Sequence, residues 1–450
     1  MSLGGSSGNL VLSSGAGGTV YSGSASYLLQ GGTLQLNNTT AGFISIGRNA
    51  AATFTQSGGT VTLARVSDVL SVGDYSTGSY AISGGQLTAS SPLAHANLGY
   101  RGGDGTLTVN GSGSFGIAGS IFLAANAANS ASAKGSATIN LQGGELAVNG
   151  MTLGRAGTTG ANGPGSATFN FSGGTLRPYS ANAVIGSATA ANNFAMDLSG
   201  TAATLSGIDL ASLTARTLDV YATLQGTGDI TVTGGVVNLR ATNIHSGLTT
   251  ISAGTAALIG SASASSGFVV NGTLDLTSQT SGYVFGSNQT VSGTGMIALP
   301  TAGPGAALSG FLVPGNSPGT LVFTGAGTFD LTQAIDTESG RLVFELDGIG
   351  ASDLVTVASG TLAIGSGLLE FSDFAFTPLA GFGQGTYTLF SAATITGSLG
   401  SVTSGVINGL SSSLQIAGSE VQLVVVPEPG AIALAGIGIG LAGWLIRRRR

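Results

Sequence analysis

Residues 137–146 read Ala-Thr-Ile-Asn-Leu-Gln-Gly-Gly-Glu-Leu, and this stretch predicts the fold. Apolar and polar side chains alternate as far as Gln142, which is typical of a strand with one buried face. The Gly-Gly step that follows allows a tight turn, because glycine adopts positive φ without a steric penalty. The same pattern recurs at residues 28–34, 54–61, 82–87 and 169–176.

The copies keep a common spacing. Their leading glycines, with degenerate copies at Gly111 and Gly200 included, follow one another after 27, 26, 27, 32, 30 and 27 residues. A second marker, apolar-x-apolar-Gly, keeps step with them at residues 44–47, 70–73, 96–99 and 151–154. A period near 27 accommodates three short strands and three turns, and stacking such units about 4.8 Å apart pairs every strand with its neighbour.

We therefore predict an all-β chain that forms a parallel β-solenoid of roughly 27-residue coils over residues 1–300. The alternative is one or more antiparallel sandwiches, because these also combine short strands with regular turn signals. A sandwich, however, has no reason to keep a 27-residue repeat.

Residues 243–255 read Asn-Ile-His-Ser-Gly-Leu-Thr-Thr-Ile-Ser-Ala-Gly-Thr and resemble the autotransporter-associated β-strand repeat. Ala256 stands where that repeat usually has Leu, and residues 271–276 supply the strand of the next coil. The resemblance covers about residues 200–300. It implies an extracellular or cell-surface β-helix stalk and names no ligand.

The pattern changes over residues 301–425. Residues 314–319 read Pro-Gly-Asn-Ser-Pro-Gly, a double turn that leads into further apolar-alternating stretches. We expect a β-rich capping module here, because an open solenoid end exposes unpaired strand edges that invite aggregation.

The last 25 residues predict a membrane segment. Pro427-Glu428-Pro429 is followed by the uncharged residues 430–446 and then by Arg447, Arg448, Arg449 and Arg450. As a helix, residues 430–446 would reach about 26 Å, which is just enough for a single transmembrane span. The four Arg residues should stay in the cytoplasm, so the β-rich body would lie outside the membrane, N-out and C-in.

This tail resembles the PEP-CTERM sorting signal. The resemblance implies that Pro427, Glu428 and Pro429 are the recognition motif, residues 430–446 a transient inner-membrane span, and Arg447–Arg450 the stop. It also implies export in a Gram-negative-type bacterium, processing near the motif by an exosortase, and a place in the cell envelope or the extracellular polysaccharide matrix. The first eight residues lack the basic and apolar regions of a secretory signal, so we expect the true start to lie upstream.

Composition argues against several other functions. Only 7 % of the residues are charged, and the first 446 carry nine basic against 19 acidic residues, which disfavours nucleic-acid binding. Without cysteine there is no disulfide framework or zinc–thiolate site, and we expect no cofactor. The two histidines, His95 and His245, are expected at the surface or in turns rather than as catalysts.

Two groups of charged residues are candidate sites. An acidic stretch could supply oxygen ligands to a hard cation, but its spacing matches no calcium loop, so we expect no metal site; its members are Asp330, Asp336, Glu338, Glu345, Asp347 and Asp353. Charged residues between Gly31 and Gly200 fall at changing places in the repeat, and no column is expected from them; they are Arg48, Arg65, Asp74, Arg101, Asp104, Lys134, Glu145, Arg155 and Arg177.

These patterns favour an exported structural protein rather than an enzyme. Its partners would be an exosortase and, through a polar face rich in hydroxyl and amide groups, exopolysaccharide or other surface proteins. Two alternatives remain open at this point: a carbohydrate-active β-helix enzyme, which would need carboxylates on one solenoid face, and an adhesin that binds a protein receptor.

Overall fold

The computed structural model describes residues 2–3, 9–12, 23–36, 42–64, 67–125, 134–155, 164–200, 203–315, 317–337 and 339–427. The chain divides into two compact units, Met1–Ser266 and Gly267–Arg450. Each unit is described by itself.

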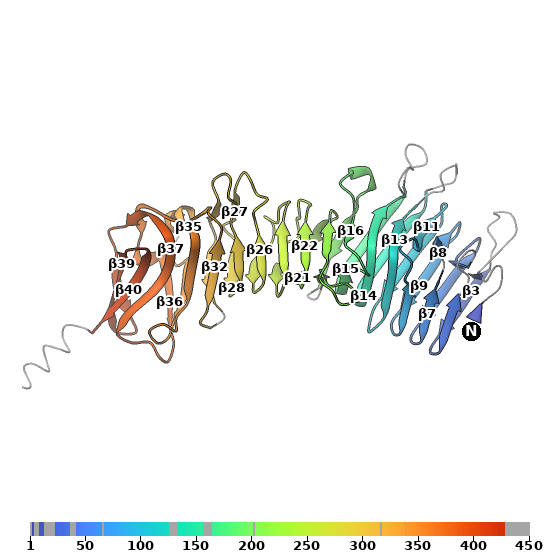
Figure 1. Cartoon of the computed structure of the whole chain (residues 1–450), viewed down its shortest axis with the longest axis horizontal. Coiled ribbons are helices and arrows are strands. Elements are labelled where there is room, and N and C mark those ends of the chain that lie inside the picture. Colours follow the sequence, from blue (N-terminus) through green and yellow to red (C-terminus); the bar gives the residue numbers. More distant parts are fainter. Residues whose placement is uncertain are drawn as a thin grey trace, which may run out of the picture. The chain divides into compact units, whose positions relative to one another are not determined.

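In its described residues, the first unit contains β-strands and one 3-10 turn (Figure 1). Its elements are β1 (Ser2–Leu3), β2 (Leu10–Leu12), β3 (Ser24–Leu29), β4 (Thr33–Leu36), β5 (Ile44–Ile46), β6 (Ala51–Gln56), β7 (Thr60–Leu63), β8 (Asp68–Asp74), β9 (Gly78–Ile82), β10 (Gln86–Ala89), β11 (His95–Tyr100), β12 (Asp104–Val109), β13 (Ser114–Leu123), β14 (Ser136–Leu153), β15 (Ser166–Arg177), β16 (Ala183–Ile185), η2 (Ala190–Asn192), β17 (Ala195–Leu198), β18 (Ala203–Ser206), β19 (Thr217–Val220), β20 (Thr223–Gly226), β21 (Ile230–Thr233), β22 (Val236–Leu239), β23 (Leu248–Ile251) and β24 (Thr255–Leu258).

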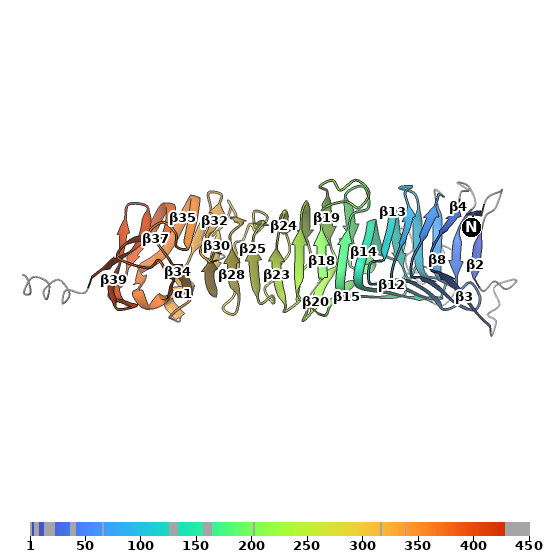
Figure 2. The ribbon, with the colours of Figure 1, turned by 90° about the horizontal axis from the view of Figure 1, so that it is seen from below.

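Strands of successive coils follow one another along this unit (Figure 2), and their parallel pairings form three columns. One column runs through β3, β6, β9, β12 and β14. The second runs through β4, β7, β10 and β13, and the third through β5, β8, β11 and the end of β13. This parallel pairing is consistent with the predicted β-solenoid and does not fit antiparallel sandwiches.

The coil length follows the predicted period at first and then shortens. Leu34 pairs with Val61, 27 positions later, and Val61 pairs with Leu87 after a further 26. Near the end of the unit, Val232 pairs with Ile251, only 19 positions later. The later coils therefore keep the parallel register with fewer residues in their turns.

The core lies between the three columns. Alternate residues of each strand point inward, so Ile46, Val72 and Leu98 stack in the third column with no exposed surface. Burying a side chain of this size stabilises the fold by roughly 1.5–3 kcal/mol. In the first column the rings of Tyr27 and Phe54 lie 4.9 Å apart, close to the spacing of adjacent strands.

The second unit begins with further parallel strands and includes one short α-helix (Figures 1 and 2). Its elements are β25 (Gly267–Val270), β26 (Thr273–Asp275), β27 (Tyr283–Phe285), β28 (Thr290–Gly293), β29 (Met296–Ala298), β30 (Ala306–Leu308), β31 (Phe311–Pro314), β32 (Thr320–Thr324), β33 (Thr328–Asp330), α1 (Thr332–Thr337), β34 (Leu342–Leu346), β35 (Leu354–Leu369), η3 (Phe371–Asp373), β36 (Phe374–Pro378), β37 (Gly385–Leu399), β38 (Ser404–Ile407), β39 (Leu410–Ala417) and β40 (Glu420–Val426).

Strand direction changes only near the end of this unit. The strands on either side of residue 300 pair in parallel, β28 with β31 and β29 with β32, and β35 still pairs in parallel with β37. After β37 the chain turns to antiparallel pairing, β37 with β40, β40 with β39 and β39 with β38. The domain boundary that we predicted at residue 300 stays a prediction.

The predicted membrane helix over residues 430–446 lies outside the described residues. Among the residues that the structure does describe, no helix is long and apolar enough to cross a membrane.

Candidate functional site

The predicted sorting segment follows directly from the last strand. In β40, the buried Val425 pairs with Gly385 of β37 on one side and with Ser412 of β39 on the other. Pro427 directly follows β40 and is half-buried. Proline has no N–H to donate, so it cannot extend the ladder. Of the predicted motif, Pro427 is the described residue, and Glu428, Pro429 and Arg447–Arg450 lie outside the described part.

The acidic residues between 330 and 353 stabilise separate loops rather than forming one cluster. Asp353 accepts the N–H of Gly319 and the N–H of Glu345, each at 2.8 Å. Burial raises the pKa of Asp353, although these two N–H groups oppose the change. Asp347 accepts the N–H of Gly381 at 2.6 Å.

The other candidate ligands do not join them. Asp330 accepts the N–H of Thr332 at 2.8 Å, Asp336 is exposed on α1, and Glu338 lies outside the described residues. Across the described ranges, no three His, Asp or Glu side chains are grouped so that they could hold a metal ion.

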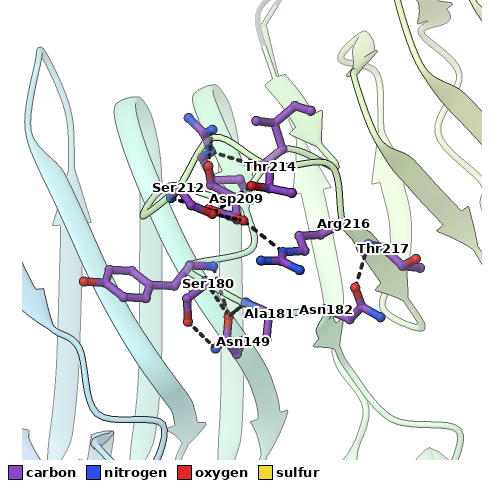
Figure 3. A network of polar contacts seen from close by, with 12 residues as sticks. Asn149, Ser180, Ala181, Asn182, Asp209, Ser212, Thr214, Arg216 and Thr217 are labelled. Atoms are coloured by element: carbon purple, nitrogen blue, oxygen red, sulfur yellow. Dashed lines mark hydrogen bonds and ion pairs between the residues drawn. The ribbon is translucent and has the colours of Figure 1, made fainter.

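A polar network fastens the loop between β18 and β19 to its neighbours (Figure 3). The buried Asp209 carboxylate accepts Arg216 Nε at 2.9 Å and both the N–H and the hydroxyl of Ser212. Burial alone would raise the pKa of Asp209, but the Ser212 hydrogen bonds and the Arg216 charge hold it below its ordinary value.

Two further side chains complete this network. Arg177 donates to the carbonyls of Ile208 and Asp209 and forms a 2.7 Å ion pair with Glu145. Asn149 Oδ1 accepts the N–H groups of three consecutive residues, 179–181, at 3.1–3.2 Å. Because these polar groups bind one another, the network explains the loop's position and is a poor candidate for ligand recognition.

A different cluster lies on the third strand column. Gly47 directly follows β5, and Gly73 and Gly99 are the next-to-last residues of β8 and β11; each has positive φ. A Cβ atom at Gly99 would overlap the carbonyl oxygen of Ser136, so glycine is required by sterics as well as by φ. The residues directly after these glycines are thereby held at the same corner of successive coils.

Arg48, Asp74 and Arg101 meet at this corner. Arg48 Nε lies 3.8 Å from Asp74 Oδ2, and Arg101 Nη1 lies 3.4 Å from Asp74 Oδ1. The Asp74 side chain is only 6 % exposed, whereas the two arginines are about one-third exposed. Burial raises the pKa of Asp74, against the two arginine charges, which lower it.

Aromatic rings support the two guanidinium groups. Arg101 Cζ lies 4.4 Å from the ring centroid of Tyr100 and 5.3 Å from that of Tyr75. Arg48 Cζ lies 6.0 Å from the ring of Phe43. Such contacts restrain the guanidinium planes.

These side chains surround a cavity of about 250 Å³, which we call the Asp74 pocket. It is lined by Phe43, Arg48, Ser71, Asp74, Asn97, Tyr100 and Arg101. Asn97 is completely buried, and neither its amide nitrogen nor its amide oxygen has a hydrogen-bond partner among the described residues. An unpaired buried polar group costs about 1–3 kcal/mol, so the position of Asn97 calls for an explanation beyond folding.

Our expectation that the charged residues form no column was wrong at this corner, since Arg48, Asp74 and Arg101 lie on three successive coils. A signal for it was present in the sequence. Each of the three follows the glycine of the second marker by one or two positions. The relation is easy to miss, because Arg48 and Asp74 follow their glycines by one position whereas Arg101 follows its glycine by two.

The expectation that the histidines lie at the surface or in turns holds only in part. His245 lies in the connection between β22 and β23 but is completely buried, and its Nε2 lies 3.0 Å from the Thr249 hydroxyl. Burial lowers the pKa of His245 to about 4, although Asp229 opposes the change. His95 is half-buried, and its Nδ1 accepts the N–H of Ser120 at 3.0 Å.

Comparison with known proteins bears on the end of the chain. Residues 425–450 match the PEP-CTERM protein-sorting motif, which confirms the resemblance seen in Pro427–Pro429 and in the segments after it. This motif implies export, cell-surface anchoring through the C-terminal segment and sorting by an exosortase. No curated protein is similar enough to the chain to count as a relative. The resemblance of residues 243–255 to the autotransporter-associated repeat stays a prediction.

Proposed function

We propose that the protein is a structural component of the cell surface, exported, processed near Pro427–Pro429 by an exosortase, and associated with exopolysaccharide. The observation that carries this proposal is the match of residues 425–450 to the PEP-CTERM protein-sorting motif. The motif begins within the last strand, β40, so the folded body and the sorting segment are directly connected.

The tail acts in this proposal as a transient anchor. Residues 430–446 carry no charge and would cross the inner membrane, with Arg447–Arg450 in the cytoplasm and the body outside. Pro427 and Pro429 keep the preceding segment out of helix, which leaves an extended stretch for a processing enzyme.

The β-rich body acts as a scaffold. Its parallel coils have the architecture expected of a surface stalk, and β37–β40 close the second unit with antiparallel pairing. This supports the capping role that we expected for residues 301–425, because a closing sheet covers strand edges that would otherwise recruit other chains. The resemblance of residues 243–255 to the autotransporter-associated repeat supports the role of the body as a surface stalk.

A non-catalytic role in glycan association agrees with the polar side chains of the body. Asn170 and Asn140 form a hydrogen-bonded stack on successive coils, and Asn140 continues it to Thr108. Such hydroxyl and amide groups bind sugar hydroxyls without needing charge. The buried carboxylates Asp209 and Asp353 bind main-chain N–H groups, which is a positioning role rather than the paired arrangement of glycosidases.

Fractionation of a host that contains an exosortase tests the routing. The full chain should reach the cell surface in processed form, whereas a variant that lacks residues 427–450 should not be delivered to the cell surface. A second variant, in which Arg447–Arg450 are replaced by Ala, is a further control, because it removes the proposed membrane stop and keeps the recognition motif Pro427–Pro429. Equal surface delivery of the truncated chain would contradict the routing.

Retention on the host's exopolysaccharide tests the association. The full chain should be retained in a pull-down, and no retention would remove the glycan part of the proposal. Release of reducing sugars from the same material would instead support the carbohydrate-active enzyme.

A further inference from the structure

The Asp74 pocket faces away from the core of the first unit. Ile44 and Ile46 of β5 are buried toward the core, and side chains alternate along a strand, so the positions between such residues point outward. Ser71 and Asn97 occupy this outward position and are paired across β8 and β11. The pocket is thus built on the outer surface of the sheet and covered at its sides by the long side chains at the coil corner.

Asn97 determines what kind of group the pocket can satisfy. Its amide oxygen needs a donor and its amide nitrogen needs an acceptor, and both atoms are buried without a partner among the described residues. A sugar hydroxyl is both a donor and an acceptor. An anion that can only accept hydrogen bonds, such as acetate, would leave the amide oxygen unsatisfied.

The charge of the pocket adds a second requirement. Two guanidinium groups face one carboxylate, so the pocket carries a net positive charge within a body that is strongly acidic. Each arginine contacts Asp74 through a single nitrogen at 3.4–3.8 Å, although a guanidinium has five N–H donors. The remaining donors suit a ligand carboxylate, which arginine binds with paired hydrogen bonds.

The size of the pocket limits the ligand to a small unit. Its volume of about 250 Å³ is below the roughly 300–1,000 Å³ of sites for drug-sized molecules. A single sugar ring with one carboxylate meets the requirements of size, charge and hydroxyl groups together.

We infer that the Asp74 pocket is a subsite for one uronic-acid residue of an acidic polysaccharide, an inference that rests on the proposed association with exopolysaccharide. The sugar carboxylate lies against Arg48 and Arg101, and a ring hydroxyl bonds to the Asn97 amide. Asp74 holds the two guanidinium groups in place between coils.

Titration calorimetry on the full chain in detergent tests this inference. The probes are trigalacturonate, which carries uronic-acid residues, and maltotriose, a neutral sugar of the same length. Trigalacturonate should bind at least about tenfold more tightly than maltotriose. Equal affinity for the two, or no binding of trigalacturonate, overturns the inference.

Two variants and a matched control locate the binding. Arg101→Gln and Asn97→Ala should each weaken trigalacturonate binding about tenfold or more, since each removes one of the required contacts. Arg240→Gln is the control, because Arg240 also pairs with an aspartate, Asp219, and lies 5.2 Å from a tyrosine ring, Tyr221, but does not line the pocket. Full affinity in Arg101→Gln contradicts the assignment, even if Asn97→Ala fails to fold.

The outcome separates this inference from the function on which it rests. If wild-type protein is retained on exopolysaccharide but does not bind trigalacturonate, only the uronic-acid subsite is contradicted. Protein that binds trigalacturonate at the pocket but is not retained on exopolysaccharide would support the subsite and remove the glycan part of the proposed function.

Discussion

The hydroxyl of Tyr80 donates a 2.5 Å hydrogen bond to Gln56 Oε1 inside the core, where both side chains are buried. The two residues lie on neighbouring coils. Gln56 Nε2 in turn donates to the carbonyl of Gly59 on its own coil and to that of Gln86 on the next, so one buried amide ties two neighbouring coils together. Burial raises the pKa of Tyr80, so the phenol stays a donor even in alkaline solution.

Replacing Tyr80 by Phe should therefore lower the free energy of unfolding by about 1–3 kcal/mol, because Gln56 Oε1 would be left buried and unpaired. Urea unfolding followed by circular dichroism measures the change. Tyr27→Phe is the control, since Tyr27 stacks in the same column but is half-buried. A loss as large in Tyr27→Phe would contradict the role of the buried amide.

Gly99→Ala should destabilise the fold by about 1–3 kcal/mol or more, because φ at this residue is +70° and a Cβ would overlap the Ser136 carbonyl. Gly31→Ala is a matched control. No atom lies within 4 Å of a Cβ at Gly31. Thermal unfolding should give a lower melting temperature for Gly99→Ala than for Gly31→Ala. Similar melting temperatures would show that the corner tolerates a side chain.

His245 should make stability fall as the solution is acidified. Its pKa is about 4 in the folded protein against an ordinary value of 6.5, so the unfolded chain binds the proton first as pH drops. This contribution is fully present above pH 6.5 and is lost between pH 6.5 and about 4, by roughly 3 kcal/mol.

His245→Gln removes the titrating ring and tests this pH dependence. The difference in unfolding free energy between pH 7 and pH 4 should be smaller in the variant than in the wild type, because every other titrating group is shared. If both proteins lose the same stability over this range, His245 is not responsible.

Asp209→Asn should destabilise the loop between β18 and β19, because Arg216 would lose its negatively charged partner. Because Arg216 is 34 % exposed, the expected cost is that of a hydrogen bond to a charged group, about 1.5–3 kcal/mol. Limited proteolysis should cut this loop faster in the variant than in wild type. Asp219→Asn is the control, since Asp219 pairs with Arg240 but is 21 % exposed, and it should leave the cleavage rate unchanged.

Part of the Asp74 pocket could have been predicted from the second marker. The marker places a glycine turn at the end of β5, β8 and β11, and Arg48 and Asp74 come directly after it. The burial of Asn97 could not be predicted in this way. It occupies the same marker position as Ser71 and Thr152, and nothing local distinguishes them.

The acidic stretch shows the opposite situation. Its members lie close together in the sequence, but Asp347 binds the N–H of Gly381, 34 positions away, and Asp353 binds the N–H groups of Gly319 and Glu345. Carboxylates that are close in the sequence need not be close in space, because the strands between them place them in different parts of the fold.

The amino-acid sequence by itself determined the strands, their buried faces, the turns, the parallel repeat and the sorting motif. These depend on local physics: alternation selects one face of a strand, glycine permits a turn, and the tail is read as a linear signal. Only the tertiary structure decided that Arg48, Asp74 and Arg101 meet, that His245 is buried and that later coils shorten to 19 residues. Contacts between coils depend on lateral register, which is set by loop lengths and core packing across the stack rather than by any single stretch of residues.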